Sequence, residues 1–242
     1  MSGAAKRRWD ARSVALPEWV RGIEEVLPSV RPGQLSRLRP PVDATTRPAA
    51  VLMLFSGVAR QDGDVLLIER ASTLRSHPGQ AAFPGGALDP DDRTAEDAAL
   101  REAEEETGLR PKDVLVLGTL PSLWVPVSGF SVTPVVAWMP EPAPVRVRDA
   151  AEVARVQWLR LDALLDPRHR FSTRHPSGYV GPAFDVDGMF VWGFTAGLLS
   201  RLLDVAGLTV PWDATRLEPL PERYLAPAPA RQRIEDESGV EP

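Results

Sequence analysis

The sequence contains no cysteine, which excludes disulfide bonds, thiolate metal sites and cysteine nucleophiles. Long apolar runs are also missing. The basic residues at positions 6–8 precede no hydrophobic segment, so we expect neither a signal peptide nor a membrane span, and the cytoplasm is the default compartment. Basic residues form no dense block and the net charge is −5, which argues against nucleic acid as the main partner. We therefore expect a small-molecule substrate.

The chain has 242 residues, 43% hydrophobic and 25% charged, enough for one large domain or two small ones. We divide it into an N-terminal arm, 1–47, a main domain, 48–210, and a proline-rich tail, 211–242, which we expect to be disordered. A short helix is expected in the arm, over 17–27. For the two proline-rich ends, simple disorder and the contact of a homodimer both stay open.

Hydrophobic patterning predicts a mixture of strands and helices in the main domain. Strands are expected at 49–58, 65–68, 114–120, 132–138 and 153–159, the first two forming a hairpin. Helices are expected at 162–165 and 190–205, the second strongly amphipathic. The segments 121–131 and 169–184 are interpreted as a loop and an irregular stretch. This alternation by itself indicates only the α/β class.

The most informative segment is a predicted helix over about 95–107, framed by a threonine N-cap and a glycine. Near its end, Glu102, Glu105 and Glu106 follow at three- and four-residue spacing, so their carboxylates share one face. The simplest interpretation is a solvated acidic face. Against it, mutual repulsion and opposition to the helix dipole cost up to about 1 kcal/mol per acid, which favours a bound cation.

Carboxylate oxygens without cysteine or paired histidines nearby are typical of Mg²⁺ or Mn²⁺ sites rather than zinc sites. Mg²⁺ held by a few carboxylates together with substrate phosphates is the usual arrangement for chemistry on a diphosphate. Arg101 precedes Glu102 and has a forked guanidinium able to hold a carboxylate in place. The helix therefore predicts a divalent-metal site that acts on a phosphate-containing substrate.

Residues 101–109, Arg-Glu-Ala-Glu-Glu-Glu-Thr-Gly-Leu, resemble the second half of the Nudix box, the signature of the Nudix hydrolase family. The family pattern reads Gly, five residues, Glu, seven residues, Arg-Glu-apolar-any-Glu-Glu-any-Gly-apolar. The first half departs from it by one extra residue between Gly86 and the arginine. The early glutamate of the pattern falls on Asp92 or Arg93, with Glu96 further on, so the identity of this acid stays open.

Residues 66–86 are similar to an additional signature, that of the coenzyme A pyrophosphatase branch of the family. It reads roughly Arg-Ser-x-x-Leu-Arg-x-His-x-Gly-Glu-Val-x-Phe-Pro-Gly-Gly, and that branch also tends to carry the longer box. Segments 132–136 and 190–196 look like the same branch. Three positions differ from its usual serine, glutamate and valine: Ala71, Gln80 and Ala81.

The resemblance implies an α/β/α sandwich around a mixed β-sheet and a set of site residues. These are the metal ligands Glu102, Glu105 and Glu106, the catalytic residues Arg101, Glu105 and Glu152, and the substrate contacts Arg70, Arg75, His77, Gly85 and Gly86. Glu152 is the candidate base on a late loop, and a solvated glutamate is the alternative. For the arginines and the histidine the alternative is plain surface charge, and for the glycines a tight turn.

Three functions are compatible with the sequence. The first, implied by the resemblance, is hydrolysis of coenzyme A or its thioesters to 3′,5′-ADP and 4′-phosphopantetheine or its acyl form. The second is hydrolysis of another nucleoside diphosphate derivative, such as ADP-ribose, a dinucleotide or a damaged dNTP. The third is a Nudix-fold module that binds without hydrolysing. A module that does not hydrolyse is expected to have lost a residue of the Nudix box, and the second half of the box has lost none.

Overall fold

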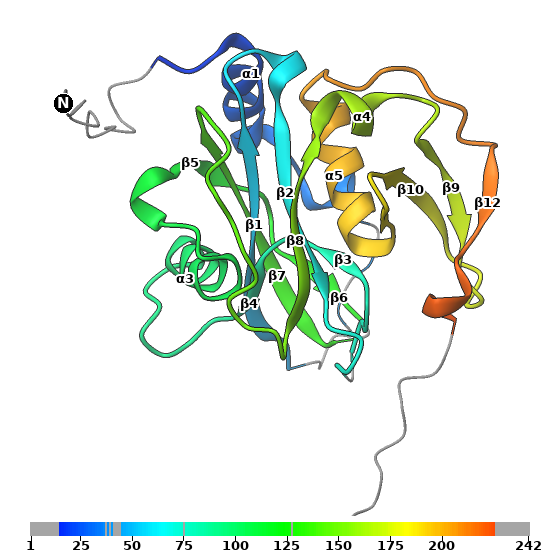
Figure 1. Ribbon diagram of the computed structural model, residues 1–242, viewed down its shortest axis with the longest axis horizontal. Helices are drawn as coiled ribbons and strands as arrows, with labels where there is room; N and C mark the ends of the chain where they lie inside the picture. Colours follow the sequence, from blue (N-terminus) through cyan, green and yellow to red (C-terminus); the bar gives the residue numbers. More distant parts are fainter. Residues whose placement is uncertain are drawn as a thin grey trace, which may run out of the picture.

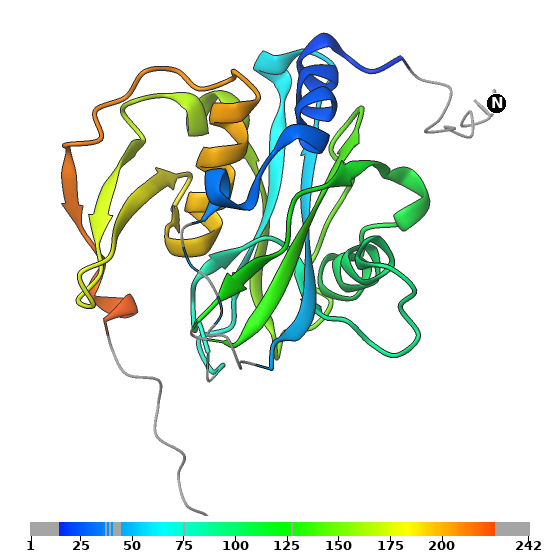
Figure 2. The ribbon, with the colours of Figure 1, turned by 180° about the vertical axis from the view of Figure 1, so that it is seen from behind.

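The computed structural model describes residues 15–36, 38, 40, 45–74, 76–126 and 128–225. In this part of the chain a mixed eight-stranded sheet has helices on both faces, which confirms the predicted α/β/α sandwich (Figures 1 and 2). Its strands are β1 (Arg47–Ser56), β2 (Asp64–Arg70), β3 (Ala81–Ala82), β4 (Gly85–Ala87), β5 (Leu115–Thr119), β6 (Leu123–Val125), β7 (Phe130–Met139) and β8 (Val153–Arg160). The helices are α1 (Glu18–Val26), α2 (Pro32–Leu35), α3 (Ala95–Thr107), α4 (Leu161–Leu165) and α5 (Gly193–Val205).

The main sheet is built around β1 and β7, which run parallel from Arg47 beside Phe130 to Ser56 beside Met139. The strand order is β3-β2-β1-β7-β5, with β8 paired to β2, β4 to β1 and β6 to β7. β1 and β2 are antiparallel, as the predicted hairpin requires. The apolar run of β1 is nearly continuous because both faces of this central strand are covered.

Alternate residues of β1 point into two separate cores. Met53 and Phe55 belong to the core that α1 and α5 cover, and Trp19 of α1 packs edge-on against Phe55 with ring centroids 6.3 Å apart. Leu52 and Leu54 belong to the opposite core, under α3. The fully buried apolar residues of α3 are all alanines, so this helix lies close to the sheet.

A second sheet, with four strands in the described residues, lies on the far side of α5 (Figure 1). Its strands are β9 (Arg170–Arg174), β10 (Val180–Val186), β11 (Met189–Val191) and β12 (Leu217–Pro219), in the order β11-β10-β9-β12. Phe184 and Val191 on its inner face join the core of α5. The second sheet thus shares one hydrophobic core with the main sheet, through α5.

This second sheet corrects three of our predictions. The stretch 169–184 is not irregular, because it forms β9 and most of β10, paired antiparallel. The helix expected from 190 begins at Gly193, since the preceding residues pair with β10 as β11. The segment 211–225 is not disordered, because β12 pairs with β9 and a 3₁₀ turn follows at Glu222–Tyr224. The rest of the expected tail, 226–242, lies outside the described residues.

Two smaller outcomes concern the arm and the loop at 121–131. α1 confirms the helix expected over 17–27, and it packs into the main core rather than apart from it. The segment 121–131 is not entirely a loop, because β6 pairs with β7 there. No helix within the described ranges has both the length and the apolar character needed to cross a membrane.

Candidate active site

α3 begins and ends where its sequence predicts. The Thr94 hydroxyl accepts a hydrogen bond from the Asp97 N–H at 3.1 Å, as an N-cap does. Gly108, at the other end, has a φ of 72°, a left-handed conformation that glycine adopts without steric cost. The helix expected over about 95–107 is therefore confirmed, and its last turn carries the acidic residues to one end of the sheet.

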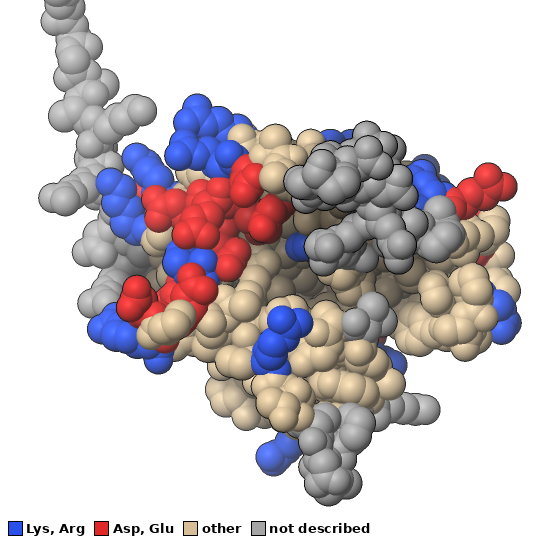
Figure 3. Space-filling view, turned by 90° about the horizontal axis from the view of Figure 1, so that it is seen from below, with Lys and Arg blue, Asp and Glu red and all other residues tan. Residues whose placement is uncertain are grey.

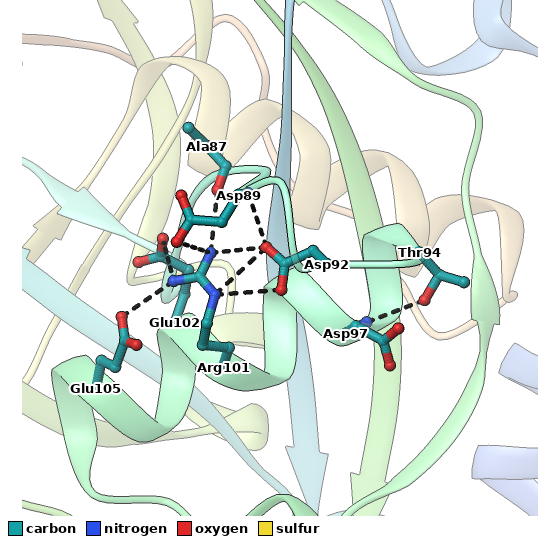
Figure 4. Close-up of polar contacts among 8 residues, drawn as sticks. All are labelled: Ala87, Asp89, Asp92, Thr94, Asp97, Arg101, Glu102 and Glu105. Atoms are coloured by element: carbon teal, nitrogen blue, oxygen red, sulfur yellow. Dashed lines mark hydrogen bonds and ion pairs between the residues drawn. The ribbon is translucent and has the colours of Figure 1, made fainter.

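Arg101 uses all five of its guanidinium N–H groups on the protein (Figure 4). Nε and Nη2 donate to the Asp92 carboxylate at 2.9–3.3 Å. Nη1 donates to one oxygen each of Glu102 and Glu105 at 3.0 Å, and Nη2 also donates to the Ala87 carbonyl at 3.2 Å. Because every donor is engaged, Arg101 orients carboxylates and has no N–H left for a substrate.

Glu106 is the buried acid of the site, only 2% exposed. Its Oε2 accepts a hydrogen bond from the Gly85 N–H at 3.0 Å, whereas its buried Oε1 has no partner among the described residues. Burial raises the pKa of Glu106 to about 8, and the charges of Glu102 and Glu152 act in the same direction. A buried carboxylate oxygen without a partner is costly, and a cation beside it removes that cost.

Gly85 and Gly86 lie at positions where a side chain would not fit. A Cβ on Gly86 would collide with the Glu102 carboxylate, and one on Gly85 would collide with the Ala50 carbonyl. β4, which begins with these glycines, is paired to β1. Burial raises the pKa of Glu102, and the hydrogen bond from Arg101 opposes that rise. Because a Cβ on Gly86 would overlap the Glu102 carboxylate, any side chain at this position would displace that carboxylate.

Glu152 lies in the exposed turn before β8, and its backbone carbonyl accepts a hydrogen bond from the Ala71 N–H at 2.8 Å. Burial is the main cause of the raised pKa of Glu102 and of Glu106, and the charge of Glu152 adds to it in both cases. The structure thus brings the residue predicted as catalytic base to the same end of the sheet as the acids of α3.

The predicted substrate loop follows β2. Arg70 has a buried Nε without a hydrogen-bond partner in the described residues, and its positive charge acts on Glu106 against the effect of burial. His77 Nδ1 lies 3.0 Å from Gln80 Oε1. Arg75, the remaining predicted contact of this loop, lies outside the described residues. Among the described residues of this segment, Arg70 is a cation that acts on Glu106.

The donors fit a divalent cation, although the described residues form no closed cage around one. Within the described ranges, no three carboxylate or imidazole groups converge into a metal cluster. Arg101 holds the carboxylates of Glu102 and Glu105, while Gly85 holds one oxygen of Glu106 and leaves the other free. Mg²⁺ usually takes one or two carboxylates and completes its shell with waters and substrate phosphates, so a cage is not required.

Figure 3 shows the molecule from below, with acidic and basic residues coloured. Acidic side chains gather on one part of it, beside a hollow lined mainly by uncharged residues.

A family model described as the NUDIX domain matches residues 46–177, more than half of the chain. The chain belongs to the Nudix family. It is similar to the protein called uncharacterized Nudix hydrolase NudL of Escherichia coli (strain K12), with 40% identity over 175 residues, 68% of this chain and 87% of the relative. The NudL protein of Enterobacter sp. (strain 638) is 40% identical over 163 residues, 64% of this chain and 81% of the relative. The crystal structure of RenU, a Nudix hydrolase from M. smegmatis, is 25% identical, covers 69% of this chain and 89% of its own, and has a TM-score of 0.49.

Membership of the Nudix family defines the reaction class. The chain is a Nudix pyrophosphohydrolase, which acts on a phosphorus-containing anhydride. Nudix hydrolases generally use divalent metal ions, and the free oxygen of Glu106 together with the other carboxylates fits that requirement.

Of the candidates that the sequence offers for the early acid of the Nudix box, Asp92 is the one that contacts Arg101. It is the sixth residue after Gly86, as the family pattern requires, so the extra residue of this box lies between Asp92 and Arg101. Its carboxylate binds the Arg101 guanidinium, and the hydrogen bond from Arg101 lowers the pKa of Asp92. Counting forward from the glycine gives Asp92, and counting backward from the arginine gives Arg93. Glu96 is exposed and makes no such contact.

Proposed function

We propose that this Nudix hydrolase cleaves the diphosphate bond of coenzyme A or its thioesters, releasing 3′,5′-ADP and 4′-phosphopantetheine or its acyl form. The observation that supports this best is the position of segment 66–86, whose sequence is similar to the signature of the coenzyme A branch. This segment ends at the glycines that contact Glu106 and Glu102. In this proposal, the segment that selects the substrate lies next to the acids.

The carboxylates of Glu102, Glu105 and Glu106 would hold the divalent ion, which we propose is Mg²⁺ or Mn²⁺. When bound, such an ion neutralises diphosphate charge and makes water more acidic. Arg101 keeps two of these carboxylates in fixed orientations through its hydrogen bonds. Glu152, exposed and near the acids, would accept the proton of the attacking water, and Arg70 would bind phosphate oxygens.

The principal alternative is a Nudix hydrolase of another nucleoside diphosphate derivative, such as ADP-ribose, a dinucleotide or a damaged dNTP. It is favoured by the three departures from the branch signature, Ala71, Gln80 and Ala81, since the box does not determine substrate choice. A Nudix-fold module that binds without hydrolysing is the second alternative. The complete set of Arg101, Glu102, Glu105 and Glu106 gives it no support.

The deciding experiment is a titration of the purified protein with Mg²⁺ and Mn²⁺ against coenzyme A, ADP-ribose, NADH, a diadenosine polyphosphate and the common dNTPs, with products identified by mass. Metal-dependent formation of 3′,5′-ADP from coenzyme A, at a kcat/KM well above the others, supports the proposal. A higher kcat/KM for another compound transfers the assignment to the first alternative. No turnover of any compound would favour the binding module.

A second measurement tests recognition of the 3′-phosphate. Arg75→Ala should raise the KM for coenzyme A more than the KM for an analogue without the 3′-phosphate, because a guanidinium matches phosphate oxygens. Equal effects on the two substrates would contradict a specific 3′-phosphate contact at this position.

A further inference from the structure

The chain between β7 and β8 runs past the end of α3 and carries Glu152 just before β8 (Figure 1). The Arg146 N–H donates to the Thr107 carbonyl at 2.9 Å, and the Arg148 N–H donates to the Glu106 carbonyl at 3.1 Å. Two backbone hydrogen bonds thus fasten this segment to the last residues of the helix that carries the acids. The segment therefore enters its final turn at a fixed place relative to that helix.

Asp149 forms that final turn. Its Oδ1 accepts a hydrogen bond from the Ala151 N–H at 2.8 Å, two residues further on. Its carbonyl accepts from the Val153 N–H at 2.9 Å and from the Glu152 N–H at 3.3 Å. An aspartate whose side chain accepts from the backbone two residues on stabilises a turn in this way. The side chain and the carbonyl of Asp149 therefore both hold the turn from which Glu152 projects.

The backbone of Glu152 is held on both sides. Its N–H donates to the Asp149 carbonyl, and its own carbonyl accepts from the N–H of Ala71, the first residue after β2. The Glu152 side chain is exposed, so the place of its carboxylate depends on this backbone rather than on packing. In addition to the larger effect of burial, the charge of Glu152 raises the pKa of Glu102 and of Glu106. The held backbone thus brings the Glu152 carboxylate close to these acids.

We infer that Asp149 is a positioning residue, whose side-chain hydrogen bond with the Ala151 N–H fixes the turn that presents Glu152 to the acids of α3. Asp149 acts through Glu152 and does not itself contact the substrate. The hydrogen bond needs an acceptor oxygen but no charge, so asparagine can replace Asp149 and alanine cannot. The inference rests on the proposed function, in which Glu152 is the base of the hydrolysis.

The turn is measurable in the full chain without metal or substrate. We expect the Ala151 amide to exchange its hydrogen with water more slowly in the parent protein and in Asp149→Asn than in Asp149→Ala, because only alanine removes the acceptor. Solvent-exchange NMR measures these rates. Equal rates in the parent protein and Asp149→Ala would show that the bond does not form in solution, and would overturn the inference whatever the substrate is.

Kinetics with coenzyme A, or with whichever compound of the panel is turned over, test the catalytic role. Asp149→Ala should lower kcat about 3- to 10-fold, the range of one hydrogen bond, and leave KM unchanged. Asp149→Asn should keep the kcat of the parent protein. Asp213→Ala is the matched control, because it removes an equivalent bond from the Thr215 N–H, 2.9 Å long, before β12. Equal losses of kcat in Asp149→Asn and Asp149→Ala, or a change in KM alone, would reject the inference.

Glu152→Gln separates this inference from the proposed function. It should lower kcat on the order of 100-fold, as expected for loss of a general base. Adding Asp149→Ala to it should cause no further loss, because a residue that acts through the base then has nothing to position. A further 3- to 10-fold loss in the double variant would reject the inference and keep the base. Unchanged kcat in Glu152→Gln would instead reject the proposed base, and with it the role of Asp149.

Discussion

α3 and α5 are both thirteen residues long and cover opposite faces of the main sheet, yet they contribute very different interactions. α5 buries four leucines, Leu198, Leu199, Leu202 and Leu203. α3 buries alanines, a threonine and the ionisable side chain of Glu106. α5 therefore supplies much of the apolar core. α3 buries less apolar surface, and its last turn carries the acids of the site.

The acidic end of α3 is held by local compensation rather than by apolar burial. Its last carbonyls, those of Glu106 and Thr107, accept backbone hydrogen bonds from Arg148 and Arg146. Arg101 offsets the repulsion between neighbouring carboxylates. We therefore expect substitutions in α5 to change stability and those in α3 to change catalysis, and the variants below test that division.

The largest effect is expected from Leu199→Ala in α5. Leu199 is fully buried, so its truncation should lower the free energy of unfolding by roughly 2–5 kcal/mol. Chemical denaturation measures this, and kcat/KM of the remaining folded protein should not change. Arg201→Ala, an exposed position of the same helix, is the matched control and should be nearly neutral. A loss of kcat/KM in folded Leu199→Ala protein would contradict the division.

Glu106→Gln should lower activity without lowering stability. We expect kcat/KM to fall on the order of 100-fold or more, because the variant removes a proposed metal ligand. The thermal midpoint in metal-free buffer should be unchanged or higher, since glutamine is neutral without taking up a proton on folding. Glu104→Gln, exposed on the same helix, controls for the loss of a negative charge. Retained turnover in Glu106→Gln would remove Glu106 from the ligand set.

Asp92→Asn should have an intermediate effect, because Asp92 acts through Arg101. Its carboxylate accepts from two nitrogens of the guanidinium, and the neutral amide cannot replace the ion pair. We expect about a tenfold loss in activity and a similar rise in the Mg²⁺ concentration needed for half-maximal rate. Asp91→Asn, the exposed neighbour, should match the parent protein. Equal behaviour of the two variants would show that the bond is dispensable.

The smallest effect is a pH dependence of stability in metal-free buffer. The folded-state pKa of Glu106, about 8, lies above the ordinary value of 4.5, so the folded protein keeps a proton that the unfolded chain releases between these values. Stability must therefore fall as pH rises through this window, by at most about 1.4 kcal/mol per pH unit. Denaturation at pH 6 and pH 7.5 measures the slope, and Glu106→Gln should flatten it. An equal slope in both proteins would show that another group is responsible.

The strands of the second sheet could not be predicted from the sequence, and the reason is physical. β9 and β10 are short, and their pairing joins residues separated by a turn that contains proline and glycine. β12 has only three residues and pairs with β9, more than forty positions earlier. Strands this short depend on their partners for stability, so their own composition does not predict them.

The sequence by itself determined α3, its caps and the common face of its three acids, because helix period and capping depend on residues within one or two turns. It also determined the central strands, whose apolar runs are long, and the Nudix family, whose box is contiguous. Tertiary structure alone decided that Asp92 holds Arg101, that Gly85 binds one oxygen of Glu106 and leaves the other free, and that Gln80 orients His77. These contacts depend on how loops fold back onto a helix or strand, and no local pattern contains that information.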